Sequence, residues 1–519
     1  MPSRIRFLVA ALAAMSLASN AHALFDECRD AADPGYTVGF VDCQKVPATP
    51  TLGGTSAISY YVPPACAVAG RQCPVLYYFH GTGGTYREFV GAKTGLPPTA
   101  ASIKALTSGP PVDPRRVPDP WNYGTSTWIA APPLDLIIVV SHSRTLPGGY
   151  GPIPDLDPVY SDWNPRYAQG GDQEKYATPP PLFDTHFVTE IIPFVESHLP
   201  AGKGREWRAY LGISEGGFGS LVTALRHPDL VASFGSISGG ALPLALTSAI
   251  IVPGVVGLQP PVQLPYQPLP GPVAGIAPEQ AAAALDAFDL RSVVYGWGDP
   301  VADHAYWQEN TPDALATNGR ASRAGDQSQH IRFYQNDSIP RRVEDLQDSG
   351  YPLHQAYETA TLQTSNEMAR AFTQAAVEYH YEIHPGLHWT PYWVPFYRQQ
   401  LSEQYARVKH WDGSGSPPPA PDRFDYRSIY RDFDVWGWTF HVVRDPVEFL
   451  DLTDVTCSGL TLRGTGTVTV TVAASCGTGV NHSAIFVQDL GPSFPVDEPA
   501  GAGAQPIYGR TVHVDLAPL

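Results

Sequence analysis

The sequence predicts an α/β fold followed by a small β domain, and two observations carry this prediction. Short apolar runs alternate with longer helical patterns through most of the 519-residue chain. Short buried strands separated by helices are typical of a mostly parallel sheet with helices on both faces. From residue 423 onward the chain is rich in Gly, Thr and Val, with polar and apolar residues alternating over Thr465–Val472, which favours an antiparallel β-sandwich.

The candidate strands and helices follow one another in a regular order. Phe187–Val195 has apolar residues at helical spacing and is expected to pack on the sheet. Tyr379–Ile383 alternates and is expected to be the last strand of that sheet. The earlier strands are expected at Val75–Phe79, Leu136–Val140, Ala209–Leu211, Phe234–Ile237 and Ile331–Tyr334.

A Gly/Ser/Pro-rich segment at 413–422 divides the chain, because it can pack neither as a helix nor as a central strand. We expect an α/β domain over 24–412 and a β-rich accessory domain over 423–519. Within the first, a proline-rich stretch at about 241–300 is predicted to be an insertion. A long apolar loop of this kind either lines an acyl pocket as a lid or serves only as packing.

The first 23 residues predict export. Arg4 and Arg6 precede an apolar stretch, and Ala21-His22-Ala23 has the small-x-small form of a cleavage site. The apolar stretch is shorter than the ~20 residues of a spanning helix, so we interpret 1–23 as a cleaved signal peptide of a secreted or periplasmic protein. An even count of six cysteines then predicts disulfides, whose connectivity is left open.

Composition narrows the possible partners. The formal net charge is -17 and no basic cluster is present, which argues against nucleic acid and against an anionic membrane surface. Asp155, Asp157 and Asp162 lack the glycine and the distal glutamate of a known calcium motif, so no metal site is expected there. We predict no cofactor, and the oligomeric state stays open.

The strongest functional signal is a G-x-S-x-G segment, Gly212–Gly216, between an apolar stretch and a helical run. Such a strand-to-helix elbow exposes a serine hydroxyl above a sheet, and small residues surround it because the backbone there is strained. Ser214 is therefore the candidate nucleophile. On its own, the pattern is also compatible with a glycine-rich turn.

A serine nucleophile needs a histidine to accept its proton and a carboxylate to orient that histidine. In α/β-hydrolases these follow in the order serine, acid, histidine. His388 lies just after the last predicted strand and is the candidate base, whereas His380 and His384 are expected to be structural. Asp337, on the loop after Ile331–Tyr334, is the candidate acid. Its competitors are Glu344, Asp345 and Asp348.

Two backbone N–H groups should stabilise the oxyanion. Glu215, directly after the nucleophile, is expected to supply one of them. The other is expected from the glycine-rich loop after Val75–Phe79, with Thr82 first and Gly83 next. A phosphate-binding loop is a poor alternative because no Lys-Ser or Lys-Thr follows.

These segments together resemble the esterase D and mycolyltransferase-type branch of the α/β-hydrolases, over about 74–393. The resemblance lies in Tyr77–Gly84, Tyr160-Ser161-Asp162-Trp163, Phe187–Pro193, Gly212–Gly217 and Gly386–Trp393. It implies an α/β-hydrolase fold, Ser214 as nucleophile, His388 as base, Thr82 and Glu215 as oxyanion donors, and Trp389 as a wall of the substrate site. Glu215 stands where the family usually has methionine or a similar residue.

The predicted function is that of a secreted serine esterase, which hydrolyses carboxylic esters through an acyl-enzyme. Two alternatives remain. One is an acyltransferase that passes the acyl group to a sugar hydroxyl. The other is a secreted binding protein with an inert hydrolase scaffold. The sequence leaves open the acyl and alcohol groups and the role of the C-terminal domain.

Overall fold

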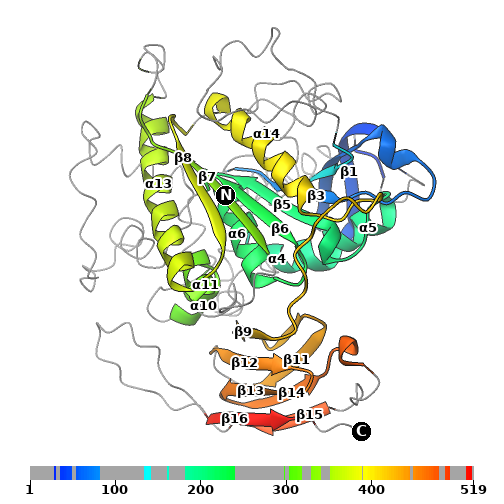
Figure 1. The fold of residues 1–519 in the computed structure, drawn as a ribbon, viewed down its shortest axis with the longest axis vertical. Helices are drawn as coiled ribbons and strands as arrows, with labels where there is room; N and C mark the ends of the chain where they lie inside the picture. Colours follow the sequence, from blue (N-terminus) through cyan, green and yellow to red (C-terminus); the bar gives the residue numbers. More distant parts are fainter. Residues whose placement is uncertain are drawn as a thin grey trace, which may run out of the picture.

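A computed structural model gives the structure of the protein (Figure 1). It describes residues 28–30, 36–49, 54–81, 134–141, 160–162, 182–239, 297, 303–317, 329–340, 346, 351–388, 390–444, 448–477, 485–490 and 510–516. The predicted signal peptide and the proline-rich insertion, apart from Trp297, lie outside these residues, as do Asp155 and Asp157.

The large sheet has eight strands in the order β1-β2-β4-β3-β5-β6-β7-β8. From β4 to β8 every neighbouring pair is parallel, whereas β1 and β2 add an antiparallel edge. The predicted strands all appear in it. The bounds are β1 Gly39–Thr49, β2 Gly54–Val62, β3 Val75–Phe79, β4 Ile137–Ser141, β5 Arg208–Ile213, β6 Ser233–Ile237, β7 His330–Asn336 and β8 Tyr379–His384.

Helices cover both faces of this sheet, as the sequence predicts (Figure 1). On one face, α6 packs on β3, β5 and β6 and α13 packs on β7 and β8, and the core there includes Tyr77 of β3. On the other face, α14 packs on β5, β6 and β7. The core there includes Leu76 and Tyr78 of β3, because successive side chains of a strand point to opposite faces. The described helices are α4 Phe183–His186, a π-helical turn Phe187–Ile191, α5 Ile192–His198, α6 Glu215–Arg226, α10 His304–Glu309, α11 Pro312–Thr317, α13 Tyr351–Gln374 and α14 Thr390–Ala406, with 3-10 turns at Pro64–Ala67, Arg205–Trp207 and Ala474–Cys476. The α/β-hydrolase type of fold is therefore confirmed.

The C-terminal segment forms two antiparallel four-stranded sheets, ordered β10-β11-β14-β15 and β16-β13-β12-β9. Their inward residues share a separate core, in which alternate residues of β11 and β14 are buried. The period-two pattern in the sequence thus has the expected cause. The bounds are β9 Phe424–Ser428, β10 Asp432–Val435, β11 Trp438–Val443, β12 Leu450–Thr456, β13 Gly459–Gly464, β14 Thr467–Thr471, β15 Ile485–Asp489 and β16 Arg510–Asp515.

All six cysteines form disulfides between neighbours in the sequence. The pairs are Cys28–Cys43, Cys66–Cys73 and Cys457–Cys476. The first two tie the amino-terminal part of the α/β domain together, and the third joins β12 to the turn after β14. No helix among the described residues combines the length and apolar character needed to cross a bilayer.

The Gly/Ser/Pro segment packs against the α/β domain. Ser416 donates its N–H to the Ala406 carbonyl at 3.1 Å, and Arg205 donates to the Pro418 carbonyl at 2.7 Å. Directly after β9, Ile429 is buried in the core of the α/β domain. Hydrogen bonds therefore hold the Gly/Ser/Pro segment on the α/β domain, and the burial of Ile429 anchors the chain just after β9.

The sandwich contacts the end of α6 that lies away from Ser214. Tyr426 donates its hydroxyl to the carbonyl of Arg226, the last residue of α6, at 2.6 Å, and Asp229 accepts from the Trp436 N–H at 3.0 Å. The 12 residues of α6 span about 18 Å at 1.5 Å per residue. The sandwich thus lies near the end of α6 that is opposite the serine elbow, and Figure 1 shows it below the large sheet.

Removing one of these contacts should destabilise the protein. We expect Tyr426→Phe to lower the free energy of unfolding by about 1–2 kcal/mol, because the buried Arg226 carbonyl loses this donor while the ring is kept. The midpoint of thermal unfolding measures the effect. An unchanged midpoint would show that the hydrogen bond between the two domains contributes nothing to stability.

Candidate active site

Ser214 occupies a strained turn between β5 and α6. Its backbone has φ 52° and ψ −126°, a region that a non-glycine residue rarely adopts. The glycines beside it are required for close approach. A Cβ on Gly212 would lie 1.9 Å from the Gly216 carbonyl oxygen, and a Cβ on Gly216 would lie 2.1 Å from the Phe79 carbonyl oxygen. The structure thus has a tight strand-to-helix turn at Ser214, as the sequence predicts.

The structure brings together a serine, a histidine and a glutamate. His388 Nε2 lies 2.9 Å from Ser214 Oγ, and His388 Nδ1 lies 2.7 Å from Glu358 Oε2. All three side chains are buried, with Glu358 at 0% exposed. The three groups come from three different elements: the elbow, the loop after β8 and helix α13. A hydroxyl, an imidazole and a carboxylate at these distances can pass a proton during nucleophilic attack.

The structure does not place the predicted acid, Asp337, beside His388. Asp337 does follow β7, but its carboxylate accepts from the backbone N–H groups of Ile339 at 2.9 Å and Gly386 at 3.2 Å. It therefore closes the turn after β7 and ties that turn to the loop after β8. The carboxylate that meets His388 is Glu358, on α13. Of the competitors considered, Glu344, Asp345 and Asp348 lie outside the described residues.

Three donors fix one oxygen of Glu358. Its Oε1 accepts from the Ser238 hydroxyl at 2.7 Å, the Gln335 side-chain amide at 2.5 Å and the Asn336 backbone N–H at 2.8 Å. These hydrogen bonds satisfy a buried polar oxygen that would otherwise lack a partner. With Oε1 held in this way, Oε2 is directed toward His388.

The loop that carries His388 is docked on α13 and α14. The His388 N–H donates to the His354 carbonyl at 3.3 Å, and the His354 ring contacts the His388 carbonyl oxygen at 2.9 Å. The Trp393 ring packs edge-on against the His388 ring, with centroids 4.9 Å apart. Trp393 also donates its indole N–H to Ser238 Oγ at 3.1 Å. Trp393 thus contacts both the histidine and the serine that holds Glu358.

The predicted oxyanion loop is described only at its start. Tyr160 donates its hydroxyl to the His80 carbonyl at 2.6 Å, which fixes the chain where it leaves β3. Glu215 begins α6 next to Ser214. Thr82, Gly83 and Trp389 lie outside the described residues, so their assigned roles stay predictions.

His380 and His384 are occupied elsewhere, as expected. Both ring Nε2 atoms contact the carboxylate of Glu382, that of His384 at 3.0 Å. Sequence reasoning missed Glu358, Ser238, Gln335 and His354. One signal could have found two of them: His354 and Glu358 are four residues apart, which places both on one face of a helix.

Comparisons with known proteins show similarity to esterases. Residues 152–406 match the family model described as "Putative esterase", which confirms the resemblance over that range. A curated relative, Esterase Rv1288 of Mycobacterium tuberculosis (strain ATCC 25618 / H37Rv), is 26% identical over 193 residues, which are 37% of this chain and 31% of the relative. The same figures hold for Esterase MT1326 of strain CDC 1551 / Oshkosh. The chain thus spans about a third of the length of these relatives.

Solved structures with weaker similarity include MPT51 (FbpC1) of Mycobacterium tuberculosis. It is 14% identical, the match covers 72% of this chain and 100% of that one, and the TM-score is 0.41. An S-formylglutathione hydrolase from Agrobacterium tumefaciens is also 14% identical, with 73% and 99% covered and a TM-score of 0.40.

Proposed function

Since residues 152–406 carry the domain of this esterase family, we propose that the protein is a secreted serine esterase that uses Ser214, His388 and Glu358. The observation that carries the proposal is the pair of contacts at His388, 2.9 Å to Ser214 Oγ and 2.7 Å to Glu358 Oε2. Burying a carboxylate, an imidazole and a strained serine next to one another costs free energy, which a protein without catalytic activity would not be expected to retain. This geometry favours the enzyme over the binding protein considered above.

In the proposed acylation step, Ser214 Oγ attacks the carbonyl carbon of the ester while its proton passes to His388 Nε2. His388 can accept this proton because Glu358 takes the Nδ1–H hydrogen bond and thereby leaves Nε2 without a proton. The carbon–oxygen bond to the alcohol then breaks, and the alcohol leaves with the proton from Nε2. The Glu358 carboxylate faces the imidazolium that forms in between and stabilises it.

In the proposed deacylation step, water attacks the carbonyl carbon of the acyl-enzyme. His388 takes a proton from the water and returns it to Ser214 Oγ as the bond between serine and the acyl group breaks. A carboxylic acid is released, and the enzyme returns to its starting state. The N–H of Glu215 is placed at the start of α6, where it can donate to the developing oxyanion.

The same acyl-enzyme could pass its acyl group to a sugar hydroxyl, so the products decide between hydrolysis and transfer. We expect the purified protein, given p-nitrophenyl butyrate and an excess of glucose, to yield free butyrate and no sugar ester. Mass spectrometry of the products measures both. A sugar ester as the main product would establish the transferase alternative.

Export is the second part of the proposal. Three disulfides within the chain fit an oxidising compartment. We expect the protein recovered outside the cytoplasm to begin at Leu24. Sequencing the amino terminus of the mature protein tests this, and an intact Met1 on the exported protein would contradict it.

Ser238 and Trp393 are proposed as positioning residues for Glu358. Trp393→Phe keeps the ring beside His388 but removes the indole donor to Ser238. We expect Ser238→Ala to lower kcat/KM about tenfold, equivalent to about 1.4 kcal/mol, because one of three donors to the carboxylate is lost. Trp393 donates to Ser238, which in turn donates to Glu358, and we call this chain of hydrogen bonds the relay. If the two residues act only through the relay, adding Trp393→Phe to Ser238→Ala should lower kcat/KM little further.

A double-mutant cycle with both single variants and the double variant measures this coupling. We expect Ser238→Ala to lower kcat with KM little changed, a split that a general loss of structure would not produce. Fully additive effects of the two substitutions would contradict the relay.

A further inference from the structure

A second cleft lies at the end of the sheet away from the triad. Its volume is about 390 Å³, within the range of small-ligand sites. It opens where β7 and β8 begin, whereas the triad lies near the other end of β7, about 20 Å away at 3.3 Å per residue. The lining residues come from β7, β8, the end of α14 and the linker: Gln329, His330, Ile331, Arg332, Glu378, Tyr379, His380, Arg407, Ser416 and Pro417–Pro419.

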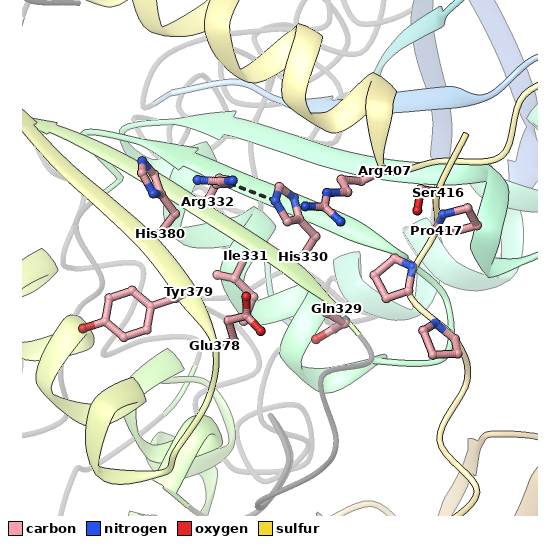
Figure 2. Close-up of a pocket in the computed structure, with 12 residues that line it drawn as sticks. Gln329, His330, Ile331, Arg332, Glu378, Tyr379, His380, Arg407, Ser416 and Pro417 are labelled. Atoms are coloured by element: carbon pink, nitrogen blue, oxygen red, sulfur yellow. Dashed lines mark hydrogen bonds between the residues drawn. The ribbon is translucent and has the colours of Figure 1, made fainter. Parts of the chain in front are cut away.

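Two arginines and a histidine form one wall of this cleft. Figure 2 shows Arg332, His330 and Arg407 side by side near the start of β7, with Ser416 and Pro417 on the linker beyond them. The chain carries a net charge of -17. A concave site with two guanidinium groups therefore differs in charge from the protein as a whole. Such groups match carboxylate and phosphate oxygens in geometry and charge.

A chain of buried hydrogen bonds fixes the first arginine. Ser233 donates its hydroxyl to the Gln404 side chain, and both residues are fully buried. His330 Nδ1 lies 3.0 Å from Ser233 Oγ, and Arg332 donates its Nε–H to His330 Nε2 at 2.8 Å. His330 must therefore carry its proton on Nδ1. Arg332 is held through its Nε, which leaves its terminal N–H groups at the cleft.

His330 serves here as a neutral acceptor. Burial, together with the positive charges of Arg332 and Arg407, lowers the pKa of His330 to about 3. The imidazole therefore adds no positive charge of its own at neutral pH. The charges of both guanidinium groups act on the His330 ring, so two like charges lie near one imidazole.

The carboxylates around the cleft leave this charge incompletely balanced. Glu403 lies 3.6 Å from Arg332 Nε and also accepts from the Tyr334 hydroxyl. His380 is paired with Glu382. Glu378 lines the cleft, but among the residues that the structure describes neither it nor Arg407 takes part in an ion pair. An anion between the two arginines would relieve their repulsion.

We propose that this cleft binds a small oxyanion, a carboxylate or a phosphate group, between Arg332 and Arg407. Arg332 supplies the donors fixed by His330, and Arg407 supplies a guanidinium from the end of α14. The linker prolines form an apolar wall that limits the size of the ligand. This site is separate from the triad and does not depend on the proposed esterase activity.

Calorimetric titration of the full-length protein with inorganic phosphate, and separately with acetate, tests the proposal. Both titrations are run at constant ionic strength, because exposed charges are screened by salt. We expect at least one of the two anions to bind at millimolar concentrations, and Arg407→Gln to weaken that binding about tenfold or more. Comparing the two anions distinguishes a phosphate site from a carboxylate site.

Arg370→Gln is the matched control, since Arg370 is an exposed arginine on α13 whose partner is Glu367. It should bind the anion like the unmodified protein. Circular dichroism checks that each variant is folded. Equal affinity in Arg407→Gln and Arg370→Gln, or no binding of either anion at about 10 mM, would overturn the proposal.

Discussion

Ser214→Ala is expected to lower kcat for ester hydrolysis by about 10⁴- to 10⁶-fold. The substitution removes the only atom that can form the acyl-enzyme in the proposed mechanism, while His388 and Glu358 remain in place. The backbone at residue 214 has a positive φ. Alanine and serine both carry a Cβ there, so the substitution adds no backbone strain and the fold should be kept. Hydrolysis of p-nitrophenyl butyrate by the purified variant measures the loss.

His388→Ala provides the companion measurement. If the histidine activates the serine, removing either residue should cost a similar factor, and removing both should cost little more. Circular dichroism and thermal unfolding show whether each variant is folded. Near-normal turnover in folded Ser214→Ala would exclude this serine as the nucleophile.

Glu358→Gln is expected to lower kcat about 10⁴-fold with the fold intact. Three donors converge on Glu358 Oε1, so the carbonyl oxygen of a glutamine should take that place. Its NH₂ group would then face His388 Nδ1 and force the imidazole proton onto Nε2. In that tautomer, His388 cannot accept the proton of Ser214.

Asp337→Asn is the matched control for this prediction. The asparagine oxygen can still accept from the N–H groups of Ile339 and Gly386, so the turn should persist. We expect kcat within about threefold of the unmodified protein, as for a substitution outside the catalytic groups. A large loss of kcat in Asp337→Asn together with a small loss in Glu358→Gln would identify Asp337 as the acid.

Much of the fold could be predicted from local patterns. Buried parallel strands such as Val75–Phe79 are short and apolar throughout, and the turn at Ser214 needs glycines on both sides. The alternation in β14 likewise follows from one buried face. Each of these signals lies within a few residues, so the sequence displays it directly.

The acid could not be predicted in the same way, because its position depends on tertiary packing. The rule that an acid follows a strand selected Asp337, which does lie there but is used to close a turn. Glu358 comes instead from the buried face of a 24-residue helix. Thr361 and Ser365 are also buried on that helix, so a polar stripe at helical spacing was the available signal.

The sequence predicts that the six cysteines form disulfides, but it does not predict which cysteines pair. Six cysteines permit many pairings, and only the folded chain shows that each cysteine bonds its neighbour in the sequence. The packing of the linker against Arg205 was also hidden, because a Gly/Ser/Pro composition is typical of flexible spacers.

Covalent trapping tests the central claim most directly. The protein is treated with a p-nitrophenyl alkylphosphonate, which phosphonylates an activated serine, and the adduct is located by peptide mass spectrometry. We predict one adduct per chain, on Ser214, with loss of activity in proportion and with labelling greatly slowed in Glu358→Gln. Labelling on another serine, or full inactivation with Ser214 unmodified, would contradict the account.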